Sequence, residues 1–187
     1  MNLEIEAKFI HISPEEIRKK LHTLWFSQVY PEFFVKRATF ICHDPHMSLR
    51  VRKEYGKITM TYKYTDVTKW ALWTEEIEVE VSDFENALGI LRHAHNPIKI
   101  LFQESKRELW KLGETEVSID EWPWTGKYIE IETESEEKLK EITASLNLDY
   151  SEALFGRVGV IYEKLGYNLD TINQIENLTF ENPPKII

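Results

Sequence analysis

The chain has 187 residues, a formal net charge of −9 and a hydrophobic content of 42%. That apolar content is enough for a globular core, and the acidic balance argues against non-specific binding to nucleic acid. No apolar run reaches the roughly 20 residues of a membrane-spanning helix, and the N-terminus lacks a secretory pattern. Cys42 is the single cysteine and fits a reducing compartment, so we expect one cytoplasmic domain over residues 1–187.

The first strand is expected over residues 3–9. Side chains alternate between the two faces of a strand. Glu4, Glu6 and Lys8 therefore share one face, and the opposite face is apolar. Taken alone, this pattern is typical of an edge strand whose charged face meets water. Its meaning depends on whether later strands repeat it.

Further segments show the same alternation of charged and apolar residues. Residues 48–53 and 58–64 flank a short turn that contains glycine, which predicts a β-hairpin. A loop at 66–72 separates this hairpin from a strand that carries several glutamates on one face. The full set of expected strands is 3–9, 33–41, 48–53, 58–64, 74–81, 98–112, 116–122 and 128–132.

Four helices are expected from apolar residues at helical spacing, and two of them follow a residue that can cap the first turn. The capping residues are Ser13 and, in the pair Ser82-Asp83, Asp83. The helices are expected over 14–25, 84–95, 135–146 and 151–165. Gly166 is the expected end of the fourth helix, and residues 167–187 are expected to form an irregular tail.

Antiparallel strands combined with amphipathic helices indicate an α+β fold. Eight antiparallel strands can close into a barrel, which removes the exposed edges of the sheet. If the apolar face of this sheet were inside, the helices would have no apolar surface to pack against. We therefore expect a closed eight-stranded antiparallel β-barrel, a tunnel with a polar lumen and with the helices packed outside.

The inward face of such a barrel would carry both cations and carboxylates. Arginine presents forked donors that suit phosphate oxygens, and lysine adds a point charge. Carboxylates beside them would repel a phosphate unless they hold a divalent cation, and hard oxygen ligands suit Mg2+ or Mn2+. A metal-bound linear triphosphate is therefore the expected ligand. The cations of this face are Lys8, Arg37, Arg50, Arg52, Lys63 and Arg107, and its acids are Glu4, Glu6, Glu76, Glu78, Asp120, Glu130 and Glu132.

The order of these residues resembles the CYTH superfamily, the triphosphate tunnel metalloenzymes. The resemblance covers about residues 1–162 and implies a tunnel that binds a triphosphate together with a divalent metal. Known members include class IV adenylyl cyclases and thiamine, RNA and inorganic triphosphatases. The motifs that carry the resemblance are Glu4-x-Glu6-x-Lys8, Arg50-x-Arg52, the Lys63 strand, Glu76-x-Glu78, Arg107, Asp120 and residues 126–132.

Carried over by position, the resemblance implies two groups of functional residues, and the proposed chemistry adds a third. Phosphate binding is implied for Lys8, Arg50, Arg52, Lys63 and Arg107. Metal binding or the orientation of water is implied for Glu4, Glu6, Asp120, Glu130 and Glu132, with Glu78 as a weaker candidate. The expected catalytic residues are Glu4 and Glu6, as proton acceptors through water, and Lys8.

Two positions depart from the resemblance. Many members have a basic residue where this chain has Ser105, and an arginine is common where it has Thr74. Both changes lower the positive charge of the expected tunnel. Either Arg37 restores part of this charge as a further substrate-binding residue, or the substrate is less charged than in other members.

We expect a metal-dependent hydrolase of a small triphosphate-containing molecule, namely inorganic, nucleoside or thiamine triphosphate. The alternative is a class IV-type adenylyl cyclase that forms cyclic AMP from ATP, because the sequence does not fix which phosphorus is attacked. A non-catalytic polyphosphate- or nucleotide-binding module is a second alternative, which would need the cations but not the metal carboxylates. No membrane or nucleic-acid partner is expected, and a homodimer is compatible with the sequence.

Overall fold

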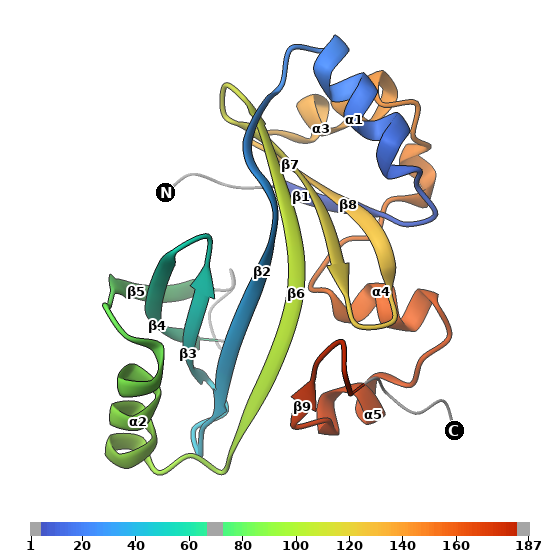
Figure 1. The fold of residues 1–187 in the computed structure, drawn as a ribbon. Coiled ribbons are helices and arrows are strands. Elements are labelled where there is room, and N and C mark those ends of the chain that lie inside the picture. The colour runs from blue at the N-terminus through green and yellow to red at the C-terminus, as the bar shows by residue number, and fades with distance from the viewer. Residues whose placement is uncertain (1–4, 67–72, 183–187) are drawn as a thin grey trace. The chain divides into compact units, whose positions relative to one another are not determined.

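The computed structural model describes residues 5–66 and 73–182, so the site candidate Glu4 and most of the loop predicted at 66–72 lie outside the described residues. The chain forms an α+β fold in which one large sheet is combined with short helices (Figure 1). The strands are β1 Ile5–Phe9, β2 Ser27–Ile41, β3 Met47–Glu54, β4 Lys57–Asp66, β5 Trp73–Glu80, β6 Lys99–Leu112, β7 Thr115–Trp122, β8 Gly126–Thr133 and β9 Asn177–Leu178. The helices are α1 Pro14–Thr23, α2 Phe84–His95, α3 Glu136–Ser145, α4 Gly159–Lys164 and α5 Leu169–Gln174, with a 3-10 turn at Tyr150–Glu152.

The eight predicted strands are all present, and they follow one another across the sheet in the order β1-β8-β7-β6-β2-β3-β4-β5. The pairs β1–β8, β8–β7, β7–β6, β2–β3, β3–β4 and β4–β5 are antiparallel. The large antiparallel sheet is thus confirmed. The predicted closed barrel is not confirmed, because no strand pairing joins β1 to β5 within the described part of the chain.

The chain divides into two compact units, which are described one at a time. Within the described residues, unit 1 consists of 5–33 and 105–173, and unit 2 consists of 34–66, 73–104 and 174–182. The strands β2 and β6 each contribute residues to both units.

In unit 1, α1 and α3 lie side by side (Figure 1), and the ammonium group of Lys20 in α1 donates to the backbone carbonyl of Leu146 at the end of α3 at 2.7 Å. Both helices pack on the apolar face of the strands. The buried core of this unit consists of Ala7, Phe9, Ile17, Leu21, Phe26, Trp110, Val117, Ile119, Ile129, Ile131, Leu139, Ile142 and Leu146. The charged residues of β1 and β8 lie on the opposite face, as the sequence predicts.

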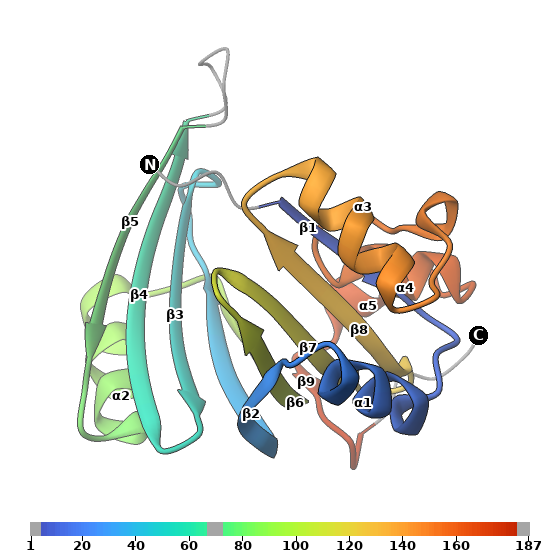
Figure 2. The same cartoon turned by 90° about the horizontal axis from the view of Figure 1, so that it is seen from above.

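In unit 2, α2 packs against the strand face that carries the apolar residues of β2 and β3 (Figure 2). The buried core of this unit consists of Ala38, Phe40, Cys42, Leu49, Val51, Ala87 and Leu88. The arginines of β2 and β3 alternate with these core residues along the strands and therefore lie on the other face. The separation of a charged strand face from a helix-covered apolar face is thus present in both units.

The predicted caps are confirmed, because the side chains of Ser13 and Asp83 each accept a hydrogen bond from a backbone amide in the first turn of α1 and α2. Ser135, which was expected inside the third helix, caps α3 in the same way. The described residues include no helix that is both long and apolar enough to cross a bilayer.

The fourth predicted helix, over residues 151–165, is wrong for its first half. Leu154 exchanges two backbone hydrogen bonds of 2.9 Å with Lys8 and so pairs with β1 instead. Gly156 has a φ of 115°, which is incompatible with a helix, and α4 begins only at Gly159. The predicted irregular tail is also wrong in part, because it contains α5 and the strand β9, which pairs in parallel with β6.

Candidate functional site

Unit 1 carries a charged face on the neighbouring strands β6, β7, β8 and β1. The register places Lys111 opposite Glu116 and Glu116 opposite Glu132. Glu132 is in turn opposite Glu6. We call these four residues the outer row. Their side chains are partly exposed, with 43% for Lys111 and 42% for Glu6.

Two further rows lie beside the outer row on the same face. Ser118, Glu130 and Lys8 form the middle row, and Arg107, Asp120 and Tyr128 form the inner row. The side chains of Lys8 and Asp120 are each only 3% exposed, whereas that of Arg107 is 34% exposed, about as much as that of Glu116 in the outer row at 33%. Exposure on this face therefore differs between neighbouring residues and does not rise steadily from the inner row to the outer row.

The buried charges of the middle and inner rows are paired with one another. The ammonium nitrogen of Lys8 lies 2.9 Å from a carboxylate oxygen of Glu6 and 2.9 Å from one of Glu130. Arg107 donates to both carboxylate oxygens of Asp120, at 2.8 and 2.6 Å, and its Nη2 also lies 3.3 Å from Glu130. Glu130 thus forms ion pairs with two cations, Lys8 and Arg107, and Arg107 forms ion pairs with two carboxylates, Asp120 and Glu130.

This pairing favours the ionised forms of Glu130, Lys8 and Arg107, whereas burial raises the pKa of Asp120 despite its pairing with Arg107. Burial alone would raise the pKa of Glu130, but the charges of Arg107 and Lys8 outweigh it and lower the pKa. Burial likewise opposes the charge of Lys8, yet Glu130 and Glu6 raise its pKa above the ordinary value. Asp120 and Glu130 raise the pKa of Arg107 in the same way against the effect of burial.

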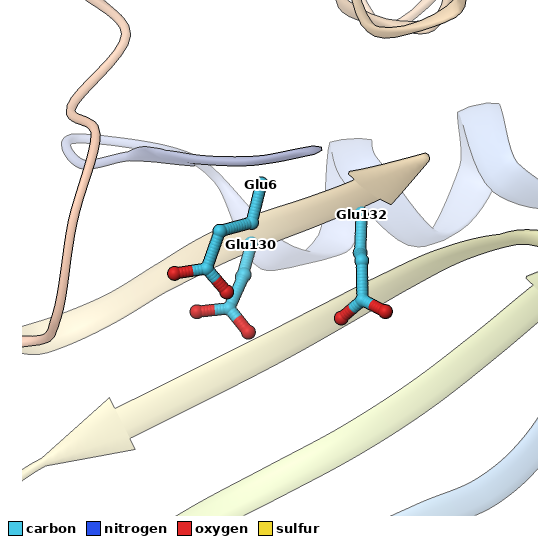
Figure 3. A group of neighbouring side chains, drawn as sticks. All are labelled: Glu6, Glu130 and Glu132. Carbon is cyan, nitrogen blue, oxygen red and sulfur yellow. The ribbon is translucent and has the colours of Figure 1, made fainter. Parts of the chain in front are cut away.

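Three carboxylates of this face converge. Glu6 from β1 and Glu130 and Glu132 from β8 each offer an oxygen, and these oxygens lie within 4.8 Å of one another (Figure 3). Figure 3 shows the three side chains extending to the same side of the two strands. Grouped carboxylate oxygens are the donors that Mg2+ and Mn2+ prefer, so these three residues fit a divalent cation.

Unit 2 carries a second charged face on β2, β3, β4 and β5. The register places Arg37 opposite Arg52, and Arg50 opposite Thr61, which is opposite Glu78. Lys63 lies opposite Glu76, and their charged groups are 2.7 Å apart. The face thus combines a group of arginines with a row of glutamates on the edge strand.

In the described part of the chain, Arg50 and Arg52 keep donors without a partner, although Nη2 of Arg52 lies 3.0 Å from a carboxylate oxygen of Glu54. The Nε atoms of Arg50 and Arg52 and the hydroxyl of Thr59 are buried and find no hydrogen-bond partner among the described residues. Nη2 of each of the two arginines lies 3.9 Å from the same oxygen of Glu78. Burial and the charge of Arg52 lower the pKa of Arg50, so a bound anion would stabilise this group.

Glu78 has a different environment from the three converging glutamates of unit 1. It accepts a hydrogen bond of 2.9 Å from the hydroxyl of Thr61. Burial would raise its pKa, but this hydrogen bond and the charges of Arg52 and Arg50 lower it. In this structure Glu78 therefore balances arginines and belongs to none of the metal-like groups of the described residues.

The predicted site residues thus fall into two groups. Unit 1 brings together Glu6, Lys8, Arg107, Asp120, Glu130 and Glu132, and unit 2 brings together Arg37, Arg50, Arg52, Lys63 and Glu78. Asp120 is paired with Arg107 and stands apart from the three converging carboxylates. The functional roles predicted for these residues stay predictions.

Sequence reasoning did not assign Lys111, Glu116 or Thr61 to the site. The signal for them was present, because each alternates with residues that were assigned on the same strand. Glu116, for example, lies in the lining of a depression that also involves Arg107, Glu130 and Glu132.

Comparisons with known proteins match most of the chain to one family. A family model described as the CYTH domain matches residues 2–155. A protein of Methanocaldococcus jannaschii named "Putative adenylate cyclase MJ0240" is 30% identical over 139 residues, which cover 70% of this chain and 76% of the relative.

Solved structures show the same fold. The PH1012 protein from Pyrococcus horikoshii is 26% identical with a TM-score of 0.60, and the match covers 81% of this chain and 94% of that one. A conserved hypothetical protein from Pyrococcus furiosus is 24% identical with a TM-score of 0.62, with coverage of 81% and 95%. The family match, which spans most of the chain and includes the charged strands, confirms the resemblance seen in the sequence: this chain belongs to the CYTH domain family.

Proposed function

We propose that this chain is a metal-dependent hydrolase of a triphosphate-containing small molecule. The observation that carries the proposal is the convergence of Glu6, Glu130 and Glu132 within 4.8 Å, beside the cations Lys8 and Arg107. Carboxylates grouped in this way suit a divalent metal, and a metal held among cations suits an anionic substrate such as a phosphate chain.

The metal would be held by Glu6, Glu130 and Glu132, with the carboxylate Glu4 of the same predicted strand as a further candidate. The charged face of unit 1 is acidic as a whole among its described residues, since five carboxylates face three cations there. An excess of negative charge on this face supports a bound divalent cation. When bound, Mg2+ or Mn2+ would neutralise phosphate charge and favour deprotonation of water.

Unit 2, taken by itself, carries a further set of candidates for phosphate binding. Arg50 and Arg52 have buried Nε atoms without hydrogen-bond partners, and phosphate oxygens are acceptors that would satisfy them. Lys63 and Arg37 are further cations on the same face. Buried Nε donors without acceptors are a feature expected of an anion site, and they remain on both arginines although Arg52 is already paired with Glu54.

In the proposed reaction, a water oxygen attacks the terminal phosphorus and the bond between that phosphorus and the bridging oxygen breaks. Glu6, whose side chain is 42% exposed, or Glu4 would accept the proton of the water. Lys8 and Arg107 would bind the phosphate oxygens and stabilise the charge that develops on the leaving diphosphate or its ester. Positioning and charge neutralisation then supply most of the rate acceleration.

The first test is Glu132→Gln in an assay of phosphate release from inorganic triphosphate, ATP and thiamine triphosphate with Mg2+ or Mn2+. We expect turnover to fall by about 100-fold or more, because a metal ligand is lost. The matched control is Glu121→Gln on the opposite face of β7, where Glu121 pairs with Lys106. Unchanged turnover in Glu132→Gln would contradict the metal role. Wild-type protein that binds triphosphate without turnover would instead indicate a binding module.

Adenylyl cyclisation is the second candidate, because the relative from Methanocaldococcus jannaschii is named a putative adenylate cyclase. In that reaction the 3′-hydroxyl of ATP would attack the α-phosphorus and release pyrophosphate. The same assay separates the two, since a hydrolase yields inorganic phosphate whereas a cyclase yields cyclic AMP. Cyclic AMP as the main product from ATP would overturn the hydrolase proposal.

A further inference from the structure

The hydroxyl of Thr59 is a buried polar group of unit 2 to which no role has yet been given. Thr59 is 2% exposed, and its hydroxyl oxygen has no hydrogen-bond partner among the described residues. Buried polar groups in folded proteins almost always have a partner, because an unpaired group loses its hydration without compensation. The unpaired hydroxyl of Thr59 therefore indicates a ligand as its partner.

The side chain of Thr59 lies on the charged face of unit 2. Its neighbours Ile58 and Met60 pack against the apolar core of the unit, so Thr59 extends to the opposite face. On that face the register places Thr59 between Arg52 of β3 and Glu80 of β5. Side chains directly opposite on neighbouring strands have Cβ atoms about 5 Å apart, so the hydroxyl is within reach of a group that Arg52 binds.

Thr61, two residues further along β4 on the same face, shows how a hydroxyl of this face can be satisfied. It lies opposite Glu78 and donates a hydrogen bond of 2.9 Å to the carboxylate. Thr59 lies opposite Glu80 in the same register, yet no hydrogen bond joins these two described side chains. Since Glu80 is exposed, water solvates its carboxylate, and the hydroxyl of Thr59 keeps its capacity to donate.

Thr59 and two arginines of β3 together offer donors to one tetrahedral anion. Arg52 lies opposite Thr59, and Arg50 lies two residues before Arg52 on the same face. The side chains of both arginines are 23% exposed, so an anion can reach them from solvent. These donors come from two strands and differ in direction. A phosphate group offers oxygens in several directions, whereas a carboxylate offers two oxygens in one plane.

We propose that the hydroxyl of Thr59 donates a hydrogen bond to an oxygen of a phosphate group that Arg50 and Arg52 bind, and that Thr59 is thus a phosphate-binding residue of unit 2. The inference rests on the proposed function, since it takes the ligand of these arginines to be the phosphate chain of the substrate. A hydroxyl adds a directional hydrogen bond without adding charge. It therefore strengthens binding at a place where a further cation would be repelled by the arginines.

The first test is the stability of Thr59→Val, which keeps the shape of the side chain and removes the hydroxyl. Without an anion, Tm should rise by about 2–4 °C, because the variant no longer buries an unpaired polar group. Thr61→Val is the comparison, and its Tm should fall by about 2–4 °C because the hydrogen bond to Glu78 is lost. A fall in Tm of Thr59→Val as large as that of Thr61→Val would show that Thr59 has a partner within the protein, and would overturn the inference.

The second test is titration calorimetry with inorganic triphosphate in the presence of EDTA, which keeps metal away from the carboxylates of unit 1. We expect the Kd of Thr59→Val to rise about tenfold, as for the loss of one hydrogen bond to a charged group. Thr59→Ser, which keeps the hydroxyl, should stay within about threefold of the wild type.

The matched control is Thr143→Val. Thr143 is a threonine of α3 that is 1% exposed, and its hydroxyl donates to the backbone carbonyl of Leu139 at 2.7 Å, so this variant should leave Kd unchanged. An unchanged Kd in Thr59→Val, an equal rise in Thr143→Val, or wild-type protein that does not bind the anion without metal would overturn the inference. If the tenfold loss is observed but the wild type shows no turnover after Mg2+ or Mn2+ is added, the proposed function is contradicted and the phosphate contact of Thr59 stands.

Discussion

The carboxylate of Glu108 lies on the helix-covered face of β6 and is only 2% exposed. It accepts hydrogen bonds from Arg18 at 2.8 Å, from Gln28 at 3.0 Å and from the indole nitrogen of Trp110 at 2.8 Å. Burial alone would raise the pKa of Glu108, but these donors, above all Arg18, outweigh it and lower the pKa. The Glu108 carboxylate is therefore ionised in the folded protein, and its ion pair with Arg18 connects α1 to β6.

Glu108→Gln should lower the free energy of unfolding at pH 7 by about 1–3 kcal/mol, because the amide nitrogen would meet groups that are all donors. In the unfolded chain a glutamate titrates near pH 4.3, above the lowered pKa of the folded state. The stabilisation by Glu108 is thus complete above that pH and is lost as the pH falls through the folded-state pKa. Urea unfolding at pH 7 and at decreasing pH measures both effects.

The control for this prediction is Glu141→Gln, which removes an exposed partner of Lys138 on α3 and should change stability little at any pH. A difference between Glu108→Gln and wild type that stays constant into strong acid would refute the titration argument. An equal loss of unfolding free energy in Glu108→Gln and Glu141→Gln would show that the buried network stabilises the protein no more than an exposed ion pair does.

Single residues were predictable where the strand alternation alone determines their face. Glu6, Lys8, Arg50 and Arg52 were assigned to a charged face in this way, and the structure places them there. The role of Glu108 was not predictable, since its partner Arg18 lies 90 residues away in the sequence. A charged residue on an apolar face indicates a buried partner but does not identify it.

At the scale of elements, the segment between α3 and α4 differs most from the prediction. Leu154 and Ile161 have the spacing of one helical face, yet Leu154 pairs with Lys8 on the edge of β1 and only Ile161 lies in a helix. The backbone groups of β1 need partners on that edge, and this tertiary pairing overrides the local helical pattern. Gly156, with a φ of 115°, allows the chain to turn between the two.

The substitution Gly156→Ala should therefore destabilise the protein by about 1–3 kcal/mol. A side chain is strained at this φ, and its Cβ would lie 3.3 Å from a side-chain carbon of Val160. Gly89→Ala is the matched substitution inside α2, where a Cβ meets nothing within 4 Å. Alanine favours the helix there, so stability should increase by about 0.5–1 kcal/mol.

Chemical unfolding of the two alanine variants and of the wild type measures the contrast. Opposite signs of the change in stability are expected for the two variants, and a stabilised Gly156→Ala would refute the conformation assigned to this segment.

The helix starts, in contrast, could be predicted without tertiary information. Ser13, Asp83 and Ser135 cap their own helices through hydrogen bonds to amides three residues away, which a local pattern can predict.

At the scale of the whole molecule, the sequence predicted that charged strand faces lie opposite helix-covered apolar faces. Both units follow this rule, because amphipathic helices must bury their apolar side against the apolar side of a sheet. Closure of the sheet could not be derived from the same information. The alternation of charged and apolar residues determines on which face of the sheet each residue lies, but it does not determine whether β1 pairs with β5. The strand β9, of two residues, is too short to give a pattern.

Metal binding should be visible as added stability of the protein, without any substrate. The three converging carboxylates join β1 to β8, so a cation held between them would stabilise the folded state but not the unfolded chain. At a metal concentration of about 100 times Kd, the gain is about 2.7 kcal/mol, which corresponds to a rise in Tm of about 5–10 °C. Thermal unfolding with Mn2+ or Mg2+, and after addition of EDTA, measures this rise and its reversal.

The part of the protein that gains stability distinguishes metal binding at a specific site from a general effect of ionic strength. Because all three carboxylates belong to unit 1, amide exchange should slow in β1 and β8, while α2 of unit 2 should change less. Glu132→Gln should abolish most of the metal-dependent rise in Tm, whereas Glu121→Gln, on the other face of β7, should retain it. If both variants kept the full rise, the metal would have to bind elsewhere, and the carboxylate group could not be the centre of a metal-dependent reaction.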